Sequence, residues 1–92
     1  MLEKTYAFVL YDISSEQLGK VFKICKKYFK HHQKSIFRGH ITTANLIKFK
    51  DEVKNTIEQD KDFITVITMF NVETFDEETI GTNKKQNESI FI

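Results

Sequence analysis

The residue whose position most invites chemistry is Asp12, which directly follows the apolar and aromatic run of residues 5–11. A carboxylate at the end of a buried strand fills no core and sits on a rigid element, as a metal ligand should. Mg²⁺ and similar hard cations take oxygen ligands and accept one or two carboxylates plus water. Two Asp12 side chains facing each other in a two-fold dimer could hold one Mg²⁺ or Mn²⁺ ion. Alternatively, Asp12 caps the turn or helix that follows it.

Other side chains that could do chemistry give weaker signals. The three histidines, His31, His32 and His40, have neither a cysteine partner nor the spacing of a zinc site. We predict that His31 and His32 close a helix and interact with its C-terminal dipole. Ser35 has no neighbouring base that would make it a nucleophile. Cys25 is the only cysteine, which excludes an intrachain disulfide, and it lies on an apolar stripe that predicts a core position.

The charges are strongly segregated although the net charge is only +1. Residues 16–50 contain nine Lys or Arg and one acid, whereas residues 51–92 contain ten acids and four Lys. Clustered positive charge on a nearly neutral chain suits a polyanionic partner. The alternative is an ordinary lysine-rich helix whose charged side faces water.

Hydrophobic periodicity predicts a strand over residues 5–11 and a helix after it. Ser14 and Gln17 have the spacing of a capping box, in which Ser14 is the N-cap residue. The apolar residues that follow recur at helical spacing and form one stripe, with lysines on the other side. The stripe consists of Leu18, Val21, Phe22, Cys25, Tyr28 and Phe29.

Residues 33–42 are predicted to be extended. Arg38-Gly39 within them could be a tight turn or a bulge, because glycine readily adopts a positive φ. The sequence leaves open whether this segment is one kinked strand or a hairpin. A second helix capped by Thr43 should follow, with an apolar stripe of Leu46, Phe49, Val53 and Ile57.

The last third of the chain predicts three further strands. Residues 63–70 form the clearest one, a polar strand over 75–82 should return beside it, and residues 89–92 are apolar again. An unpaired apolar strand at a sheet edge favours aggregation, so we expect Ile90, Phe91 and Ile92 to pair with another chain in a homodimer. The order of elements predicts an α+β fold with helices on one sheet face.

The length and composition predict one domain spanning residues 1–92. No segment reaches the roughly 20 apolar residues that cross a bilayer, and residues 1–4 lack the start of a signal peptide. We therefore expect a cytoplasmic protein that has no membrane partner.

The apolar strand ending in Tyr11-Asp12, the lysine-rich helix and the segment Ser35-Ile36-Phe37-Arg38-Gly39-His40-Ile41 follow one another in order. Together they resemble the CRISPR-associated protein two family. That family has a first strand ending in Tyr-Asp, a basic first helix and a Ser-(Val/Ile)-Phe-x-Gly-x-(Leu/Ile) segment. The strands at 63–70 and 89–92 also fall where the family has them, so the resemblance covers nearly the whole chain.

The resemblance implies a ferredoxin-like fold: an antiparallel sheet with two helices on one face and an extra C-terminal strand exchanged in a homodimer. It also implies CRISPR spacer acquisition in a prokaryote. The dimer would bridge dimers of the CRISPR integrase, CRISPR-associated protein one, and bind protospacer duplex DNA through its phosphate backbone. The lysines expected to contact nucleic acid are Lys20, Lys23, Lys27, Lys84 and Lys85.

Some members of this family are described as metal-dependent nucleases of RNA or DNA, which implies Asp12 as a catalytic metal ligand. Tyr11, Ser35 and Phe37 are candidate supporting residues; the two aromatic rings could stack on a base or simply pack in their strands. Many members carry arginines just after the Asp, where this chain has Ser14-Ser15-Glu16-Gln17 and only Lys20 as a nearby cation.

Three interpretations therefore stand. The first is a scaffold that binds DNA without cleaving it, and the second is a metal-dependent phosphodiesterase acting at Asp12. The third is an unrelated ferredoxin-like regulator or toxin-like nuclease, because a fold does not determine a function.

Overall fold

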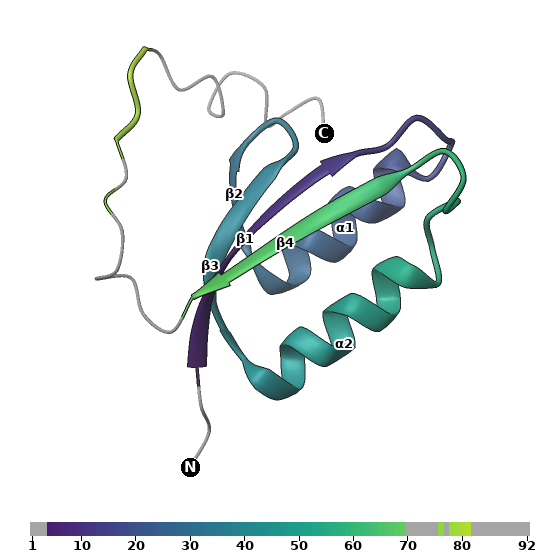
Figure 1. Cartoon of the computed structure of the whole chain (residues 1–92). Helices are drawn as coiled ribbons and strands as arrows, with labels where there is room; N and C mark the ends of the chain where they lie inside the picture. Colours follow the sequence, from purple (N-terminus) through teal and green to yellow (C-terminus); the bar gives the residue numbers. More distant parts are fainter. Residues whose placement is uncertain (1–3, 70–75, 77, 82–92) are drawn as a thin grey trace.

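Figure 1 shows the course of the chain in a computed structural model that describes residues 4–69, 76 and 78–81. The elements in these ranges are β1 (Lys4–Asp12), α1 (Leu18–Tyr28), β2 (Lys30–Gln33), β3 (Ile36–Thr42), α2 (Thr43–Lys54) and β4 (Phe63–Met69). No helix among them is long and apolar enough to span a bilayer. The predicted strand 89–92, with Ile90, Phe91 and Ile92, and the lysines Lys84 and Lys85 lie outside the described residues.

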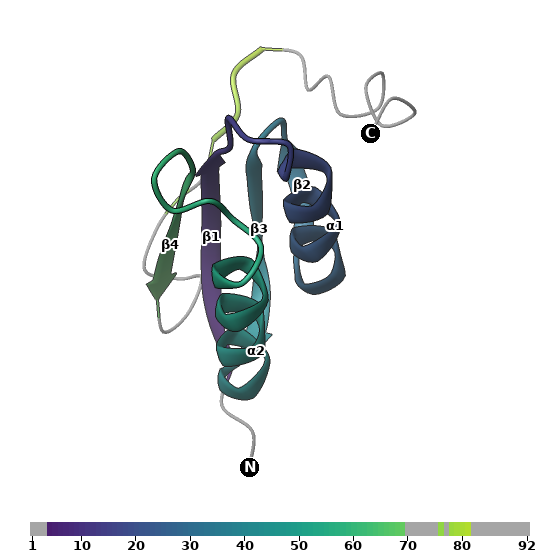
Figure 2. The ribbon, with the colours of Figure 1, turned by 90° about the vertical axis from the view of Figure 1, so that its right-hand side faces the viewer.

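The described strands form one antiparallel sheet in the order β2-β3-β1-β4. β1 pairs with both neighbours, so that Val9 lies opposite Phe37 on β3 and opposite Val66 on β4. Figure 2 shows α1 and α2 side by side on one face of this sheet. The strand order and the helix placement confirm the predicted α+β, ferredoxin-like fold.

The hydrophobic core lies between the two helices and the sheet face that they cover. Its fully buried side chains include Val9 of β1, Val21 and Cys25 of α1, Phe37 of β3 and Phe49 of α2. Burial raises the pKa of the Cys25 thiol to about 12, so the thiol is neutral, as a core residue should be. The predicted apolar stripes of both helices thus pack in the core, except for Leu18, which is 50% exposed. Ile57 packs against the same core after α2 has ended.

The predicted capping box at the start of the first helix is wrong. α1 begins at Leu18, and its N-cap residue, Gln17, makes no side-chain capping hydrogen bond. Ser14 instead turns toward the segment that precedes β4 at the same end of the sheet, where its hydroxyl donates to the carbonyl of Lys61 over 2.9 Å. A tertiary contact with a residue far along the chain therefore replaces the local cap.

The prediction that His31 and His32 close the first helix is also wrong. α1 ends at Tyr28, and both histidines belong to β2. His31 is buried, its ring lies 4.8 Å from that of Phe37, and its Nε2 donates to the carbonyl of Lys34 over 2.8 Å. Pairing with β3 satisfies this backbone and buries the ring, which a helix end exposed to solvent would not do.

Residues 33–42 form part of a hairpin, which settles the question that the sequence left open. β2 and β3 are joined by Lys34 and Ser35, and Lys34 adopts a left-handed φ of 45°. Arg38-Gly39 is not the turn: both residues lie inside β3, where Gly39 has a φ of 152°. That backbone conformation is open to glycine and strained for other residues.

Two boundaries differ from the predictions. The N-cap of α2 is Thr42 and not Thr43, since the Thr42 hydroxyl accepts the backbone N–H of Asn45 over 3.2 Å. The described residues of the predicted strand 75–82, namely 76 and 78–81, are not in a strand. These residues are exposed, and Ile80 is 88% exposed. Because their side chains are not buried against the sheet, burial does not stabilise a strand here.

Candidate functional site

Asp12 ends β1 on the sheet face that the described helices leave uncovered. Side chains alternate along a strand, and Ala7, Val9 and Tyr11 belong to the core, so Asp12 points the other way. It is exposed and lies opposite Phe63 of β4. Its carboxylate makes no hydrogen bond or ion pair with any described residue. Asp12 is therefore a rigidly placed carboxylate that a cation could reach.

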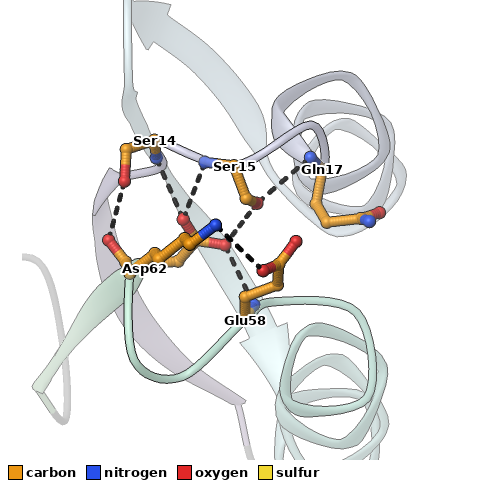
Figure 3. Close-up of polar contacts among 6 residues, drawn as sticks. Ser14, Ser15, Gln17, Glu58 and Asp62 are labelled. Atoms are coloured by element: carbon orange, nitrogen blue, oxygen red, sulfur yellow. Dashed lines mark hydrogen bonds and ion pairs between the residues drawn. The ribbon is translucent and has the colours of Figure 1, made fainter.

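The capping role considered for Asp12 belongs to Asp62, which sequence reasoning missed. One carboxylate oxygen of Asp62 accepts the backbone N–H groups of Ser14 at 2.9 Å and Ser15 at 3.0 Å. The other accepts the Ser15 hydroxyl at 2.6 Å and the backbone N–H of Glu58 at 2.9 Å (Figure 3). Asp62 thereby joins the loop after β1 to the turn before β4 and fixes the chain that leaves Asp12.

The pKa of Asp62 reflects this environment. Burial of a side chain that is only 4% exposed raises the pKa, but the hydrogen bonds from the Ser15 hydroxyl and from the backbone of Glu58, Ser14 and Ser15 outweigh it. The net result is a pKa lowered to about 2. Asp62 is thus ionised at neutral pH, and each of its two oxygens accepts two hydrogen bonds. This suits a structural role and not the binding of a metal ion.

The uncovered sheet face around Asp12 is largely apolar. Leu10 of β1 is 37% exposed, and Phe63 and Ile67 of β4 are 59% and 46% exposed. Ile67 lies opposite Phe8, and Thr65 lies opposite Leu10, so these side chains form one continuous surface. In the part of the chain that the structure describes, no helix covers this face (Figure 2).

The predicted nucleic-acid lysines on α1 fall into two groups. Lys20 and Lys23 are exposed and make no ion pair with a described residue. Lys27 instead donates to Glu52 of α2 over 2.7 Å, and the Tyr28 hydroxyl donates to the other oxygen of the same carboxylate. Hydrogen bonding to Glu52 raises the pKa of Lys27 and that of Tyr28. Lys27 is therefore partly committed to holding the two helices together.

The candidate supporting residues lie close to one another. Phe37 is fully buried, and its ring is stacked at 6.2 Å on the ring of Tyr11, which is 8% exposed. Phe37 therefore packs in its strand and has no exposed surface for a base. The carbonyl of Ser35 accepts the backbone N–H of Tyr11 over 3.2 Å, so the β2–β3 turn abuts the end of β1.

The family whose description reads CRISPR associated protein Cas2 matches residues 5–77 of this chain. The chain belongs to the Cas2 family. A relative from Thermodesulfovibrio yellowstonii, named CRISPR-associated endoribonuclease Cas2 3, is 36% identical over 80 residues, which cover 87% of this chain and 91% of the relative. The CRISPR-associated endoribonuclease Cas2 of Thermotoga maritima is 30% identical over 86 residues, covering 94% and 99% of the two chains.

Solved structures of the Cas2 family share the fold. A crystal structure of Cas2 superimposes with a TM-score of 0.81 at 27% identity, covering 89% of this chain and 92% of that one. Streptococcus pyogenes Cas2, crystallised at pH 6.5, superimposes with a TM-score of 0.73 at 26% identity and covers 83% and 99% of the two chains. The resemblance seen in the sequence is thereby confirmed.

Proposed function

We propose that this Cas2-family chain is a homodimeric scaffold of CRISPR spacer acquisition. It bridges dimers of the CRISPR integrase and binds protospacer duplex DNA through the phosphate backbone. Family membership carries the proposal, and two features of the molecule support it: the uncovered apolar sheet face and the unpaired lysines of α1.

The sheet face fits a second copy of the chain. Leu10, Phe63 and Ile67 are exposed on one surface, and apolar patches of this kind mark protein interfaces. Two sheets packed face to face would cover both copies of this surface. A two-fold axis makes such a contact self-complementary. In our proposal this axis passes near the ends of the two β1 strands, so that each Asp12 approaches its symmetry-related Asp12. The strand 89–92 would then extend the partner's sheet, with Ile90, Phe91 and Ile92 covered.

Duplex DNA would lie against the basic side of α1. Lys20 and Lys23 are exposed point charges without an acid partner among the described residues, which suits contacts to phosphates but not to base edges. Lys84 and Lys85 would add to this surface. Such binding is independent of DNA sequence and falls steeply as salt rises, by about 0.9 in the log-log slope for each phosphate neutralised.

A second candidate function is supported by the exposed Asp12 and by relatives named endoribonucleases. One Asp12 from each protomer would offer two carboxylates, which fits Mg²⁺ or Mn²⁺ because these ions accept one or two carboxylates plus water. The described residues contain no cluster of three or more metal-ligating side chains, so the donor set is sparse. A bound ion would supply an activated water and neutralise phosphate charge. Asp12 would hold that ion, and any cleavage of RNA or DNA should be slow.

Sedimentation velocity of the full chain, alone and mixed with its integrase and a blunt duplex, tests the scaffold proposal. We expect a dimer alone and one larger species in the mixture, which dissociates as salt is raised. Removal of residues 88–92 should give monomer or aggregate. A chain that stays monomeric at all concentrations, or a dimer that never joins the integrase, would refute the proposal.

A further inference from the structure

A groove of about 500 Å³ opens at the end of β1 on the helix side of the sheet, and none of the roles above accounts for it. It lies where the first turns of α1 approach the β2–β3 turn, at the end of β1. Its volume falls within the range of about 300–1,000 Å³ typical of small-ligand sites. The residues that line it are Tyr11, Leu18, Gly19, Phe22, Lys23, Lys34 and Ser35.

The floor of the groove is aromatic. The buried ring of Phe37 lies 6.2 Å from Tyr11 and 5.3 Å from Phe22, so the two lining rings rest on a rigid core residue. Leu18, which is 50% exposed, forms one side. Gly19 lines another side and has no side chain to fill the groove. A Cβ atom added at Gly19 would meet nothing within 4 Å. A flat, apolar group would therefore fit against preformed walls.

A polar group borders the groove. Tyr11 is 92% buried, and its hydroxyl makes no hydrogen bond with any described residue. Among the described residues no fully buried side-chain oxygen or nitrogen lacks a partner, so this hydroxyl reaches the surface, and Tyr11 lines the groove there. At the surface, water can hydrogen-bond to this hydroxyl. A polar atom of a ligand in the groove would replace that water.

The charges at the rim are both positive. Lys23 and Lys34 are exposed and line the groove from α1 and from the β2–β3 turn, and no acid from the described ranges lines it with them. Lys34 adopts a left-handed φ of 45°, a conformation that costs a lysine free energy. Lys34 belongs to the β2–β3 turn, and this turn places it at the mouth of the groove.

We propose that this groove binds one unpaired nucleotide, with its base against Phe22 and Tyr11 and its flanking phosphates at Lys23 and Lys34. This inference rests on the proposed nucleic-acid function and extends it: the dimer would hold a duplex along α1 and an unpaired end in the groove. A base offers the planar face, the hydrogen-bonding edge and the adjacent negative charge that the lining requires. A phosphate alone would leave the aromatic floor empty.

The test compares three fluorescently labelled duplexes by anisotropy with the full chain: one blunt, one with a short oligothymidine overhang, and one with an abasic overhang of equal length. We expect the oligothymidine overhang to bind about tenfold more tightly than either other duplex, as expected for one stacked base. Equal affinity for the oligothymidine and abasic overhangs would overturn the base site. Competition by free thymidine monophosphate would show that the nucleotide alone suffices; failure to compete would assign the site to a nucleotide within a strand.

Gly19→Leu is the sharpest variant, because the leucine side chain enters the groove from open space and removes a glycine from a helix. It should abolish the overhang preference and leave blunt-duplex affinity unchanged. Ala44→Leu, which adds the same bulk to an exposed position of α2, should keep the preference. An overhang preference that survives Gly19→Leu would overturn the proposal.

Lys34→Gly removes the rim charge and relieves the left-handed backbone, so the fold should be retained. It should lower the log-log salt slope for the overhang duplex by about 0.7, the value for one phosphate of a single strand. Lys48→Gln, on exposed α2, is the charge-matched control and should not change the overhang preference.

The outcomes also separate this proposal from the scaffold proposal. Equal affinity for blunt and overhanging duplexes would support duplex binding along α1 and overturn the nucleotide site. Binding of the overhang alone would support the nucleotide site and overturn duplex binding along α1. Displacement of the overhang by an apolar peptide that carries a carboxylate, but not by thymidine monophosphate, would assign the groove to a protein segment and overturn the nucleotide assignment.

Discussion

The hydroxyl of Ser15 donates a 2.6 Å hydrogen bond to the carboxylate of Asp62, so two loops 47 residues apart in sequence are joined. This contact determines the path of the chain between β1 and α1. It positions Asp12 on one side and the first turn of α1, with Gly19 and Lys23, on the other. Both candidate sites therefore depend on one carboxylate that belongs to neither.

The first prediction concerns the pH dependence of stability. The Asp62 pKa falls from an ordinary 3.8 to about 2 on folding, so the unfolded chain binds more protons between these values. The stabilisation by Asp62 is complete above about pH 4 and is lost as the pH falls through 2. Asp62→Asn should lower the free energy of unfolding at pH 7, and this deficit should shrink as the pH falls from 4 to 2.

Urea unfolding followed by circular dichroism at a series of pH values measures this difference. Asp60→Asn is the matched control, because Asp60 is an exposed acid two residues away. A deficit that stays constant from pH 7 to pH 2 would contradict the assignment of the low pKa to Asp62.

The second prediction separates two glycines. Gly39 has a φ of 152° inside β3, so Gly39→Ala should lower the free energy of unfolding by about 1–3 kcal/mol through backbone strain. Its Cβ would meet no atom closer than 3.8 Å, so a steric clash is not the cause. Gly19→Ala, in a helix with open space around it, should instead raise stability by up to about 1 kcal/mol. Thermal unfolding of both variants checks the opposite signs.

The third prediction concerns the dimer. Ile67→Asp places a charge on the uncovered sheet face, where Ile67 is 46% exposed. It should shift sedimentation equilibrium to monomer without changing the circular dichroism spectrum. Ile47→Asp is the control, since Ile47 is 58% exposed on α2 and should leave the dimer intact. If the Ile67→Asp chain is as dimeric as the wild type, the sheet face is not the interface.

The fourth prediction ranks the lysines of α1. Lys23 is unpaired among the described residues, whereas Lys27 forms a 2.7 Å ion pair with Glu52. Lys23→Gln should therefore lower the log-log salt slope of blunt-duplex binding by close to the full value of about 0.9. Lys27→Gln should lower it by less. Equal changes would show that the Lys27–Glu52 pair opens when DNA binds.

The fifth prediction concerns Asp12. Asp12→Ala should keep the dimer, the integrase complex and spacer acquisition in cells, because a scaffold needs no metal ligand there. Any nuclease activity of the isolated protein should require Mg²⁺ or Mn²⁺ and disappear in this variant. Asp60→Ala, another exposed acid, is the control for both assays. Loss of acquisition by an Asp12→Ala protein that still assembles would show that catalysis at Asp12 matters.

Patterns local in sequence predicted most of the fold. The apolar run at residues 5–11 and the helical stripe through Val21 and Cys25 report burial directly, and both are found where expected. His31 was wrongly assigned to a helix end because nothing in the neighbouring residues indicates a strand there. Its place in β2 depends on its contact with Phe37 of β3. The turn at Lys34-Ser35 was missed because lysine seldom adopts a positive φ.

The sequence also predicted some residues of the candidate sites and missed others. Asp12 was identified because the end of an apolar strand is visible in sequence. Asp62 was not, because its hydrogen-bond donors Ser14 and Ser15 lie 47 or 48 residues away. Its one local signal was its place in the acidic turn before the strand at residues 63–70, a position that could equally face solvent. The groove was beyond sequence reasoning, because its walls come from β1, α1 and the β2–β3 turn.

The burial of Cys25 makes the rate of its reaction with a thiol reagent a measure of how often the core opens. The thiol is inaccessible, and its pKa of about 12 leaves almost no thiolate at neutral pH, so a thiol reagent reacts only when α1 lifts from the sheet. As the sole cysteine, it yields a single labelling rate that counts these openings. Ligands that bind the groove beside α1 would slow this rate, and assembly could be timed by mass spectrometry without any added tag.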